Sequence, residues 1–329
     1  MKAGLMGRTL AFVSIFAALF LFPHESGSAE REGVNVHIPS FDISVIPLYI
    51  AKERGYFAEE GLEPSMILAS PGVGINGLVA GNFHFSASAG SASTAIARNI
   101  PLKVVLINTF KPAFWIYSRE NIKSPLQLKG KKLAVSSLGG LSHTLARLAL
   151  KKAGLDPDRE VVMIAAGTTD IRLAALQSTV VDAAVLNAPG KFKAKKAGLN
   201  EVLFIGEQID ALSGGVATTI ELIQKRPDTV QRFVTGAVKG LKYFLSNRSG
   251  SVLSMVRNMK VDMEMAKEVY EMSIPMFTEG GTAGDGFMRS EVQLQVGVLG
   301  LKEVPPFGQP FDMSFALKAN QRVRNWTPR

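Results

Sequence analysis

The sequence KKLAVSSLGGLSHTLARLALKKAGL, residues 131–155, combines three elements that together decide the fold. Residues 133–135 form the apolar run of a short buried strand, and residues 144–152 are helix formers with leucines on one side. The turn between them, 136–142, is small, polar and contains two glycines. A strand that runs through such a turn into a helix points backbone N–H groups and the positive end of the helix dipole at one spot. The stretch therefore predicts a place that attracts an anion or a polar acceptor group.

The same plan of strand, small polar turn and helix recurs along the chain. Alternation of strands and helices predicts an α/β protein with mainly parallel sheets, in which the turns lie at the carboxyl ends of the strands. Ligands bind at that edge in open α/β sheets. We therefore expect the five turns to converge on one crevice; they are residues 40–44, 88–91, 136–142, 167–170 and 187–189.

Two crossings divide the predicted fold into two lobes. The aromatic-rich run 110–117 and the glycines near 213–215 have the composition of connecting segments. Lobe 1 is then discontinuous, made of 30–116 and 214–329 with a helical C-terminal tail, and lobe 2 is the inserted segment 117–213. Two connecting strands form a hinge near 114–117 and 213–215, which suits closure around a ligand.

The N-terminus has the anatomy of a secretory signal. Lys2 and Arg8 precede an apolar run at 10–22, and Gly27-Ser28-Ala29 predicts cleavage after Ala29. The run is short for a bilayer span of roughly 20 residues, although an uncleaved anchor stays an alternative. The chain has no cysteine, so it forms no disulfide and carries no lipid on an N-terminal cysteine. We predict a soluble periplasmic protein with residues 1–29 removed.

The charge of the chain is strongly positive. Its formal net charge is +9, and the basic residues are scattered. The densest group lacks interleaved aromatic residues, so a solvated helix face is favoured over a nucleic-acid patch. The excess charge favours acidic solutes as ligands, and we expect no nucleic-acid partner. The group consists of Lys191, Lys193, Lys195 and Lys196.

Ordered segments of the chain resemble a known family. IPLYIAKERGYFAEEGLEP at 46–64 resembles the opening of periplasmic substrate-binding proteins of ABC transporters in the NMT1/THI5-like, SsuA/TauA-like group. The resemblance continues through most of residues 34–325. Its further segments are LVAGNFHFSASAG at 78–90, PLKVV at 101–105, SPLQLKGKKLAVSSLGG at 124–140, GLDP at 154–157 and AALQSTVVDAAVL at 174–186. The chain departs from the family pattern at His84, where an acidic residue is frequent, and in the segment around Thr179, near which a glycine is frequent.

The resemblance implies a type II periplasmic-binding fold, with two α/β lobes, a two-strand hinge and a helical C-terminal region. It implies a monomer without a cofactor that carries solute to a permease in the inner membrane. Carried over to this chain, the ligand-binding positions are Ser40, Phe41, Ser88, Gly90, Ser91, Ser137, Gly139, Gly140, Ser142, His143, Thr168 and Asn187.

Several side chains have both a binding and a structural interpretation. Phe41 and Trp115 either stack on a planar part of the ligand or pack in the core or hinge. His143 either donates a hydrogen bond to solute or supports its turn, and the histidine spacing matches no metal site. Asp170 has the position of a first-turn acid next to the cap Thr168, so capping is its favoured role.

The sequence favours binding over catalysis, because no nucleophile–base motif accompanies the polar turns. The predicted function is a periplasmic solute-binding component of an ABC importer, for a small polar, anionic organic solute such as a sulfonate or carboxylate. One alternative is an enzyme on the same fold that acts on a pyrimidine- or menaquinone-type precursor. The other is a periplasmic sensor that binds solute for a membrane kinase.

Overall fold

Two five-stranded sheets organise the structure, a computed structural model that describes residues 1, 30–119, 121–306 and 308–328. The predicted export signal at 2–29 lies outside the described residues. The first sheet has the order β2-β1-β3-β10-β4 and the second β7-β6-β8-β5-β9. The strands are β1 (Glu32–Ile38), β2 (Leu62–Leu68), β3 (Phe85–Ser86), β4 (Leu102–Thr109), β5 (Phe114–Ser118), β6 (Lys132–Val135), β7 (Val162–Ala165), β8 (Ala183–Asn187), β9 (Asn200–Phe204) and β10 (Gly214–Thr219).

Both sheets are mixed, which corrects the expectation of mainly parallel sheets. Strand β1 is parallel to β2 and β3, and β6 is parallel to β7 and β8, as strand–helix–strand units require. Strand β10 runs antiparallel to β3 and β4, and β5 antiparallel to β8 and β9. β5 and β10 are the strands on which the chain enters a sheet from the other one. The apolar pattern of a strand does not encode its direction, so the alternation rule failed for these two.

The chain crosses between the sheets at residues 110–113 and 209–213. Thr109 ends β4 and Phe114 begins β5, so the predicted hinge residues 114–117 belong to the second sheet. The two crossing segments are bonded to each other, since Ala211 N donates to Phe110 O at 3.0 Å and Ser213 N to Thr109 O at 3.2 Å. The first crossing does lie in the aromatic run, at 110–113, but the hinge was placed too late in the chain because residues 114–117 belong to strand β5. The lobe boundaries 30–116, 117–213 and 214–329 stay a prediction.

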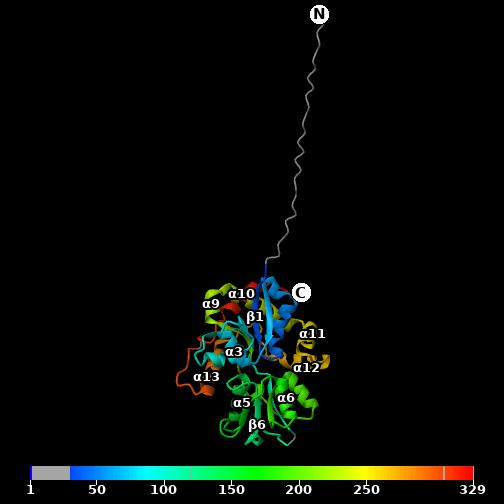
Figure 1. The fold of residues 1–329 in the computed structure, drawn as a ribbon, viewed down its shortest axis with the longest axis vertical. Helices are drawn as coiled ribbons and strands as arrows, with labels where there is room; N and C mark the ends of the chain where they lie inside the picture. The colour runs from blue at the N-terminus through cyan, green and yellow to red at the C-terminus, as the bar shows by residue number, and fades with distance from the viewer. Residues whose placement is uncertain (2–29, 120, 307, 329) are drawn as a thin grey trace. The chain divides into compact units, whose positions relative to one another are not determined.

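Helices cover both faces of the sheets, and Figure 1 shows α5 and α6 on opposite sides of β6. Most helices follow a strand and a polar turn, and the C-terminal third is mainly helical, as expected. The helices are α1 (Ile46–Glu53), α2 (Tyr56–Glu59), α3 (Pro71–Val79), α4 (Ala89–Ile96), α5 (Leu141–Lys152), α6 (Thr169–Gln177), α7 (Ala188–Lys196), α8 (Ile205–Gln208), α9 (Ile220–Lys225), α10 (Pro227–Ser246), α11 (Arg248–Met259), α12 (Met263–Ser273), α13 (Asp285–Leu299) and α14 (Ser314–Arg322), with 3₁₀ turns η1 (Ile43–Val45), η2 (Pro125–Leu128) and η3 (Ile274–Met276).

The long helix α10 anchors the core against the first sheet. Its Phe233 ring stacks on Phe85 at 3.9 Å between centroids and on Phe57 at 4.9 Å. All three rings are buried, and each such ring contributes about 1.5–3 kcal/mol through removal from water. A second core lies on the other sheet, where Leu133 and Val135 of β6 pack with Leu145 of α5. The carboxyl ends of the strands thus rest on rigid scaffolds.

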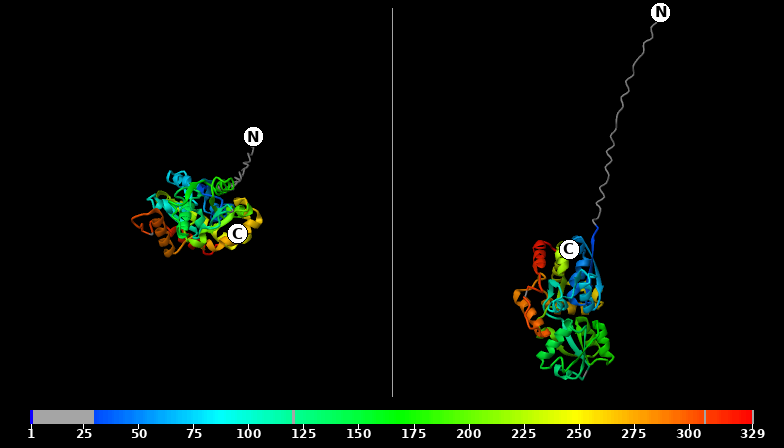
Figure 2. Two further views of the ribbon diagram at one scale, coloured as in Figure 1. Left: turned by 90° about the horizontal axis from the view of Figure 1, so that it is seen from below. Right: turned by 60° about the vertical axis from the view of Figure 1, so that its left-hand side comes forward.

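Helix α13 contacts helices that cover both sheets, and so forms a third connection between them besides the two crossings. It packs against α4, which covers the first sheet, and against α5, which covers the second; Figure 2 shows it in orange beside the green α5. Its Glu291 is buried and accepts hydrogen bonds from Ser93 Oγ at 2.9 Å and from Leu212 N at 3.0 Å. Within the described residues, no helix has the length and apolar character that crossing a membrane requires.

Candidate functional site

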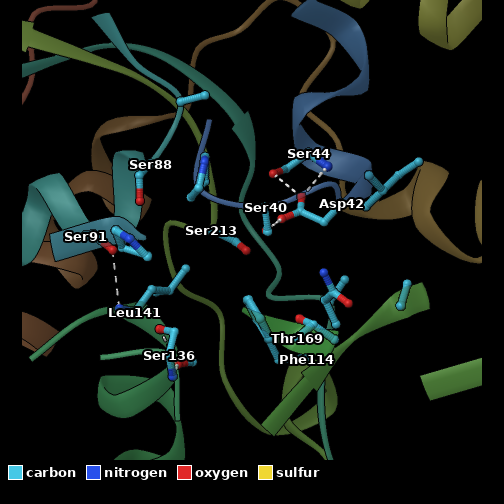
Figure 3. A pocket seen from close by; sticks show the side chains of 18 of the residues that line it. Ser40, Asp42, Ser44, Ser88, Ser91, Phe114, Ser136, Leu141, Thr169 and Ser213 are labelled. Atoms are coloured by element: carbon cyan, nitrogen blue, oxygen red, sulfur yellow. Dashed lines mark hydrogen bonds between the residues drawn. The ribbon is translucent and has the colours of Figure 1, made fainter. Parts of the chain in front are cut away.

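A cavity lies between the carboxyl ends of the two sheets. Each of the five polar turns contributes to its wall, together with residues of the crossing segments. Figure 3 shows Ser88 and Ser91 facing Ser136 and Thr169 across this space. Its hydroxyl-bearing lining residues are Ser40, Ser44, Ser70, Ser88, Ser91, Thr109, Ser136, Ser142, Thr168, Thr169 and Ser213. The turns do lie around one cavity, and their binding of a solute stays a prediction.

Five helices begin at this cavity. The N-cap residues of α3, α4, α6 and α7, together with Leu141 at the start of α5, line it. Thr168 and Asn187 cap their own helices, whereas α3, α4 and α5 have no hydrogen bond from an N-cap side chain. The first backbone N–H groups of a helix need an acceptor from outside the helix. The wall of the cavity therefore offers N–H donors and positive dipole ends from both sheets.

The turn after β1 places a carboxylate in the wall. Asp42 caps η1 and accepts hydrogen bonds from Ser44 N at 2.9 Å, Ser44 Oγ at 2.6 Å and Ser40 Oγ. Figure 3 shows the three side chains as one bonded group. The first-sheet side of the cavity therefore presents an aspartate carboxylate close to the start of α1.

The turn 136–142 after β6 is fixed by its own hydroxyl groups. Ser142 Oγ accepts from Ser136 N at 2.8 Å and lies 2.8 Å from Ser136 Oγ. Leu141 N donates a long hydrogen bond of 3.4 Å to Ser91 Oγ of α4, and this bond joins the two sides of the cavity in Figure 3. The turn that the sequence singled out therefore reaches the opposite side directly.

Arg172 carries a buried positive charge at the cavity, on the second-sheet side. Its side chain comes from α6, it lines the cavity, and the residue is 3% exposed. Nε donates to Val185 O at 2.6 Å and Nη2 to Thr169 Oγ1 at 2.9 Å, and Nη1 donates to Gly167 O. All three acceptors are neutral, and within the described residues Arg172 makes no ion pair. Burial lowers the pKa of Arg172 to about 10, so the guanidinium is charged at neutral pH.

Two other lining residues have hydroxyl groups that are able to form a further hydrogen bond. Thr109 is 3% exposed, and its Oγ1 has no hydrogen-bond partner among the described residues. Ser88 begins α4 without bonding its side chain to the helix. Buried hydroxyl groups are almost always paired, so an unpaired one in a cavity wall suggests a partner from outside the chain.

The predicted site residues separate into three groups. Ser40, Ser88, Ser91, Ser142, Thr168 and Asn187 line the central cavity. Phe41 lines a neighbouring hollow that shares Ser40, Thr168, Thr169 and Asn187 with it. Ser137, Gly139 and Gly140 line a groove on the other side, beside Ser91.

Gly90, Trp115 and His143 lie outside these linings. Gly90 packs tightly, since a Cβ there would lie 2.4 Å from Leu212 O. Trp115 is buried in β5 and stacks on Phe204 at 4.5 Å, so its structural interpretation fits its position. His143 Nδ1 accepts from Gly139 N at 3.1 Å, and burial, with Arg147 as a lesser cause, lowers its pKa. His143 thus supports the turn as a neutral ring.

Sequence reasoning missed Arg172, Thr109 and Ser213. Arg172 stands in the first turn of a predicted helix, where arginine is ordinarily solvated, and only its proximity to the turn 167–170 was a signal. Thr109 lies one residue before the predicted crossing 110–117 and Ser213 lies in the predicted crossing 213–215, where connecting residues and not lining residues were expected. A search for cations within four residues of each polar turn finds Arg172.

Comparison with known proteins agrees with this architecture. The family described as NMT1/THI5 like matches residues 42–250, more than half of the chain. The riboflavin-binding protein RibY of Chloroflexus aurantiacus is 25% identical over 276 residues, which cover 78% of this chain and 76% of that protein.

Solved structures show the same fold at low identity. The periplasmic aliphatic sulphonate binding protein SsuA of Escherichia coli superposes with a TM-score of 0.67 at 20% identity, over 87% of this chain and 99% of that one. The periplasmic nitrate-binding protein NrtA of Synechocystis gives a TM-score of 0.74 at 13% identity, over 89% of each chain. The desulfurization enzyme DSZB gives 0.66 at 15% identity, over 89% and 100%. The chain has the type II periplasmic-binding fold.

Proposed function

The chain belongs to the NMT1/THI5-like family, and from this premise we propose that it is the periplasmic solute-binding component of an ABC importer. Its ligand is a small polar, anionic organic solute, held in the cavity between the two sheets. The observation that carries the anionic character is Arg172, a buried guanidinium whose hydrogen bonds all go to neutral acceptors.

A buried cation is costly to fold around unless a negative group compensates it. The effective penalty is several kcal/mol per ion, and neutral acceptors repay it in part. The nearby Asp170 carboxylate compensates the charge in part. An acidic group of a solute in the cavity adds a direct ion pair, and each charge-assisted hydrogen bond contributes about 1.5–3 kcal/mol. The N-termini of the helices around the cavity add to the same attraction. Asp42 repels an acidic group, so the anionic end lies on the Arg172 side and hydrogen-bond donors of the solute face Asp42.

A solute that contacts residues of both sheets can change how the two sheets are arranged, and a partner protein can recognise that change. The cavity wall combines Ser88 and Ser91 from the first-sheet side with Ser142 and Thr168 from the second. A solute that bonds to both sides favours the closed arrangement, and the crossings at 110–113 and 209–213 are the segments that bend. A permease that recognises the closed form then accepts loaded protein. A sensor kinase is the alternative partner for the same closed form.

A thermal-shift screen of the purified chain tests the proposal. The panel contains alkyl- and arylsulfonates, aliphatic and aromatic carboxylates, nitrate, sulfate, sugars, amines and riboflavin. A solute that binds the folded state alone raises the melting temperature according to its concentration and Kd. We expect shifts with organic acids. Shifts with sugars or amines alone contradict the anionic assignment.

Riboflavin is in the panel because the chain is similar to RibY, whose name states that ligand. A neutral ring system in the cavity makes little use of the Arg172 charge. A shift with riboflavin and none with organic acids therefore favours a heterocyclic solute. That outcome would change the proposed class of ligand from an anion to a heterocycle, and the proposed solute-binding function would remain.

An enzyme on the same fold is the second candidate, because the fold also occurs in DSZB. Among the described residues that line the cavity there is no histidine, and the titratable side chains there are Lys111, Arg172 and Asp42, the last held by Ser40 and Ser44. General acid–base catalysis needs a titratable group within hydrogen-bond reach of the solute. Recovery of the unchanged solute after prolonged incubation supports binding, and formation of a product supports the enzyme.

A further inference from the structure

A groove continues the central cavity on one side. It runs between α3 and α4, which cover the first sheet, and the turn 137–140, which follows β6 of the second. Pro71 and Ser91 line both spaces. The long 3.4 Å hydrogen bond from Leu141 N to Ser91 Oγ crosses at this junction, and a bond of that length is weak. A solute in the cavity can therefore extend into the groove.

The walls of the groove are apolar on both sides. Ile75 and Val79 of α3 line one side, and Leu138 of the turn lines the other. Val79 is 50% exposed and Leu138 is 62% exposed. Exposed apolar side chains that face each other across a hollow indicate a binding surface more than isolated ones do. The groove suits a hydrocarbon or ring body.

A second cation lies at the groove. Arg98, in the turn that follows α4, lines it, and its guanidinium lies against Gly139, where a Cβ would be 2.9 Å from Nη1. Within the described residues, Arg98 has neither an ion pair nor a side-chain hydrogen bond. The exposed guanidinium is therefore available for an acidic group, and its partner Gly139 comes from the opposite side of the groove.

We propose that this groove is a second subsite, and that the solute is an elongated organic diacid. Resting on the proposed function, one acidic group binds at Arg172, the apolar body lies between Val79 and Leu138, and the other acidic group binds at Arg98. The two cations at the two ends of one continuous space select length and charge together. A small inorganic anion neither occupies the apolar groove nor pairs with the second cation, Arg98.

Calorimetry with two matched series tests the proposal. The probes are linear α,ω-dicarboxylates of four to twelve carbons and monocarboxylates of the same lengths, measured on the purified chain. We expect monoacids to bind, and a diacid of the preferred length to bind at least tenfold more tightly than its matched monoacid. Arg98→Gln reduces that ratio to less than about twofold and leaves the monoacid Kd unchanged. Arg172→Gln weakens both series at least tenfold.

Two further variants keep the result interpretable. Arg159→Gln removes an arginine whose side chain is 87% exposed and pairs with Asp156, so it controls for net charge and leaves the ratio intact. Leu138→Ser keeps both cations and weakens the preferred diacid about fourfold or more, as loss of apolar contact requires.

The failure of each idea has its own signature. Equal Kd values for diacids and monoacids of every length overturn the second subsite and leave the anion site in place. The same holds if Arg98→Gln weakens monoacids and diacids alike. Binding of no acid by the wild-type chain overturns the proposed function itself.

Discussion

At the scale of single residues, the site is defined by polar groups whose charge or hydrogen-bonding capacity is not fully matched by other residues of the chain. The Arg172 guanidinium is buried beside the cavity on neutral acceptors, and Thr109 Oγ1 is buried there without a partner. Folded chains satisfy such groups internally unless they serve another purpose. The sequence predicted the hydroxyl-rich turns because serine, threonine and glycine mark turns wherever they cluster. It did not predict Arg172, because the inward direction of that side chain depends on carbonyls of Gly167 and Val185.

Thr109→Val tests whether the unpaired hydroxyl serves the solute. The substitution keeps the shape and removes a hydroxyl that has no internal partner, so the free energy of unfolding stays the same or rises by up to about 1 kcal/mol. Affinity for the acidic solute falls about fivefold, as loss of one hydrogen bond of about 1 kcal/mol implies. Urea unfolding and calorimetry measure the two quantities.

The matched control is Thr235→Val in α10, far along the chain from the cavity turns. Thr235 Oγ1 donates to Gln231 O at 2.7 Å, so its loss lowers the free energy of unfolding by about 1 kcal/mol and leaves affinity unchanged. The role of Thr109 is refuted if its valine variant binds normally.

Glu291 gives the protein a pH dependence with a defined sign. Burial raises its pKa, against hydrogen bonds from Leu212 N, Gln295 and Ser93 that lower it. The folded state then holds the proton more tightly than the unfolded state, so this group's contribution to stability is full below the ordinary glutamate pKa. It is lost as pH rises through the raised pKa of the folded state. The contribution of Glu291 to the free energy of unfolding therefore increases as the pH falls from 7 toward 5.

Glu291→Gln removes this dependence. The amide keeps an acceptor for Leu212 N, and Gln295, whose Oε1 is unpaired, can turn to accept from it. We expect the free energy of unfolding of the variant to increase relative to that of the wild type as the pH rises from 4.5 to 8. Melting temperatures across that range provide the measurement, and a constant difference would show that Glu291 does not titrate.

At the scale of elements, the strand–turn–helix units and the approximate places of the two crossings were predictable, and the direction of the strands β5 and β10 was not. Residues 131–155 fold as β6, a polar turn and α5, because a short apolar run, small turn residues and helix formers each favour their own conformation. β5 and β10 carry the same apolar pattern as parallel strands, and their antiparallel pairing follows from the partner sheet. The sequence also predicted a helical C-terminal region but held no sign that α13 packs on both α4 and α5.

The end of α6 is strained at one residue. Thr179 follows the C-cap Ser178 and has φ +63°, a left-handed conformation that a β-branched residue adopts at a cost of about 1–2 kcal/mol. Thr179→Gly is expected to raise the free energy of unfolding by about 1 kcal/mol, measured by urea denaturation.

Ser178→Gly is the matched control for that gain. Its φ is −82°, which any residue adopts, so glycine there adds freedom to the unfolded chain and lowers stability by about 0.5–1 kcal/mol. If both glycine variants move stability in the same direction, the strain at Thr179 is not the cause.

At the scale of the whole molecule, function depends on close approach of the two sheets' turns. Gly90 of α4 is where they approach most visibly: a Cβ there would lie 2.4 Å from Leu212 O and 2.9 Å from Leu141 Cδ1. Because Leu212 O is a backbone atom of the crossing segment, it cannot move aside alone. A side chain at this position pushes the start of α4 away from the turn 136–142.

Gly90→Val should therefore weaken the acidic solute at least tenfold while the protein stays folded, because the clash lies between the two sides of the cavity. Calorimetry gives the Kd, and circular dichroism verifies the fold. Gly286→Ala is the control, since a Cβ at Gly286 meets nothing within 4 Å. Normal affinity in Gly90→Val would refute the need for this approach.

The central claim is that the cavity between the sheets holds an acidic solute at Arg172. A crystal structure of the complex with the tightest-binding solute from the screen tests it most directly. The account predicts an acidic group of the solute within hydrogen-bond distance of the Arg172 guanidinium, with further contacts from Ser88 or Ser91 on the other side. A solute bound outside the cavity, or one whose neutral end lies at Arg172, would contradict the claim.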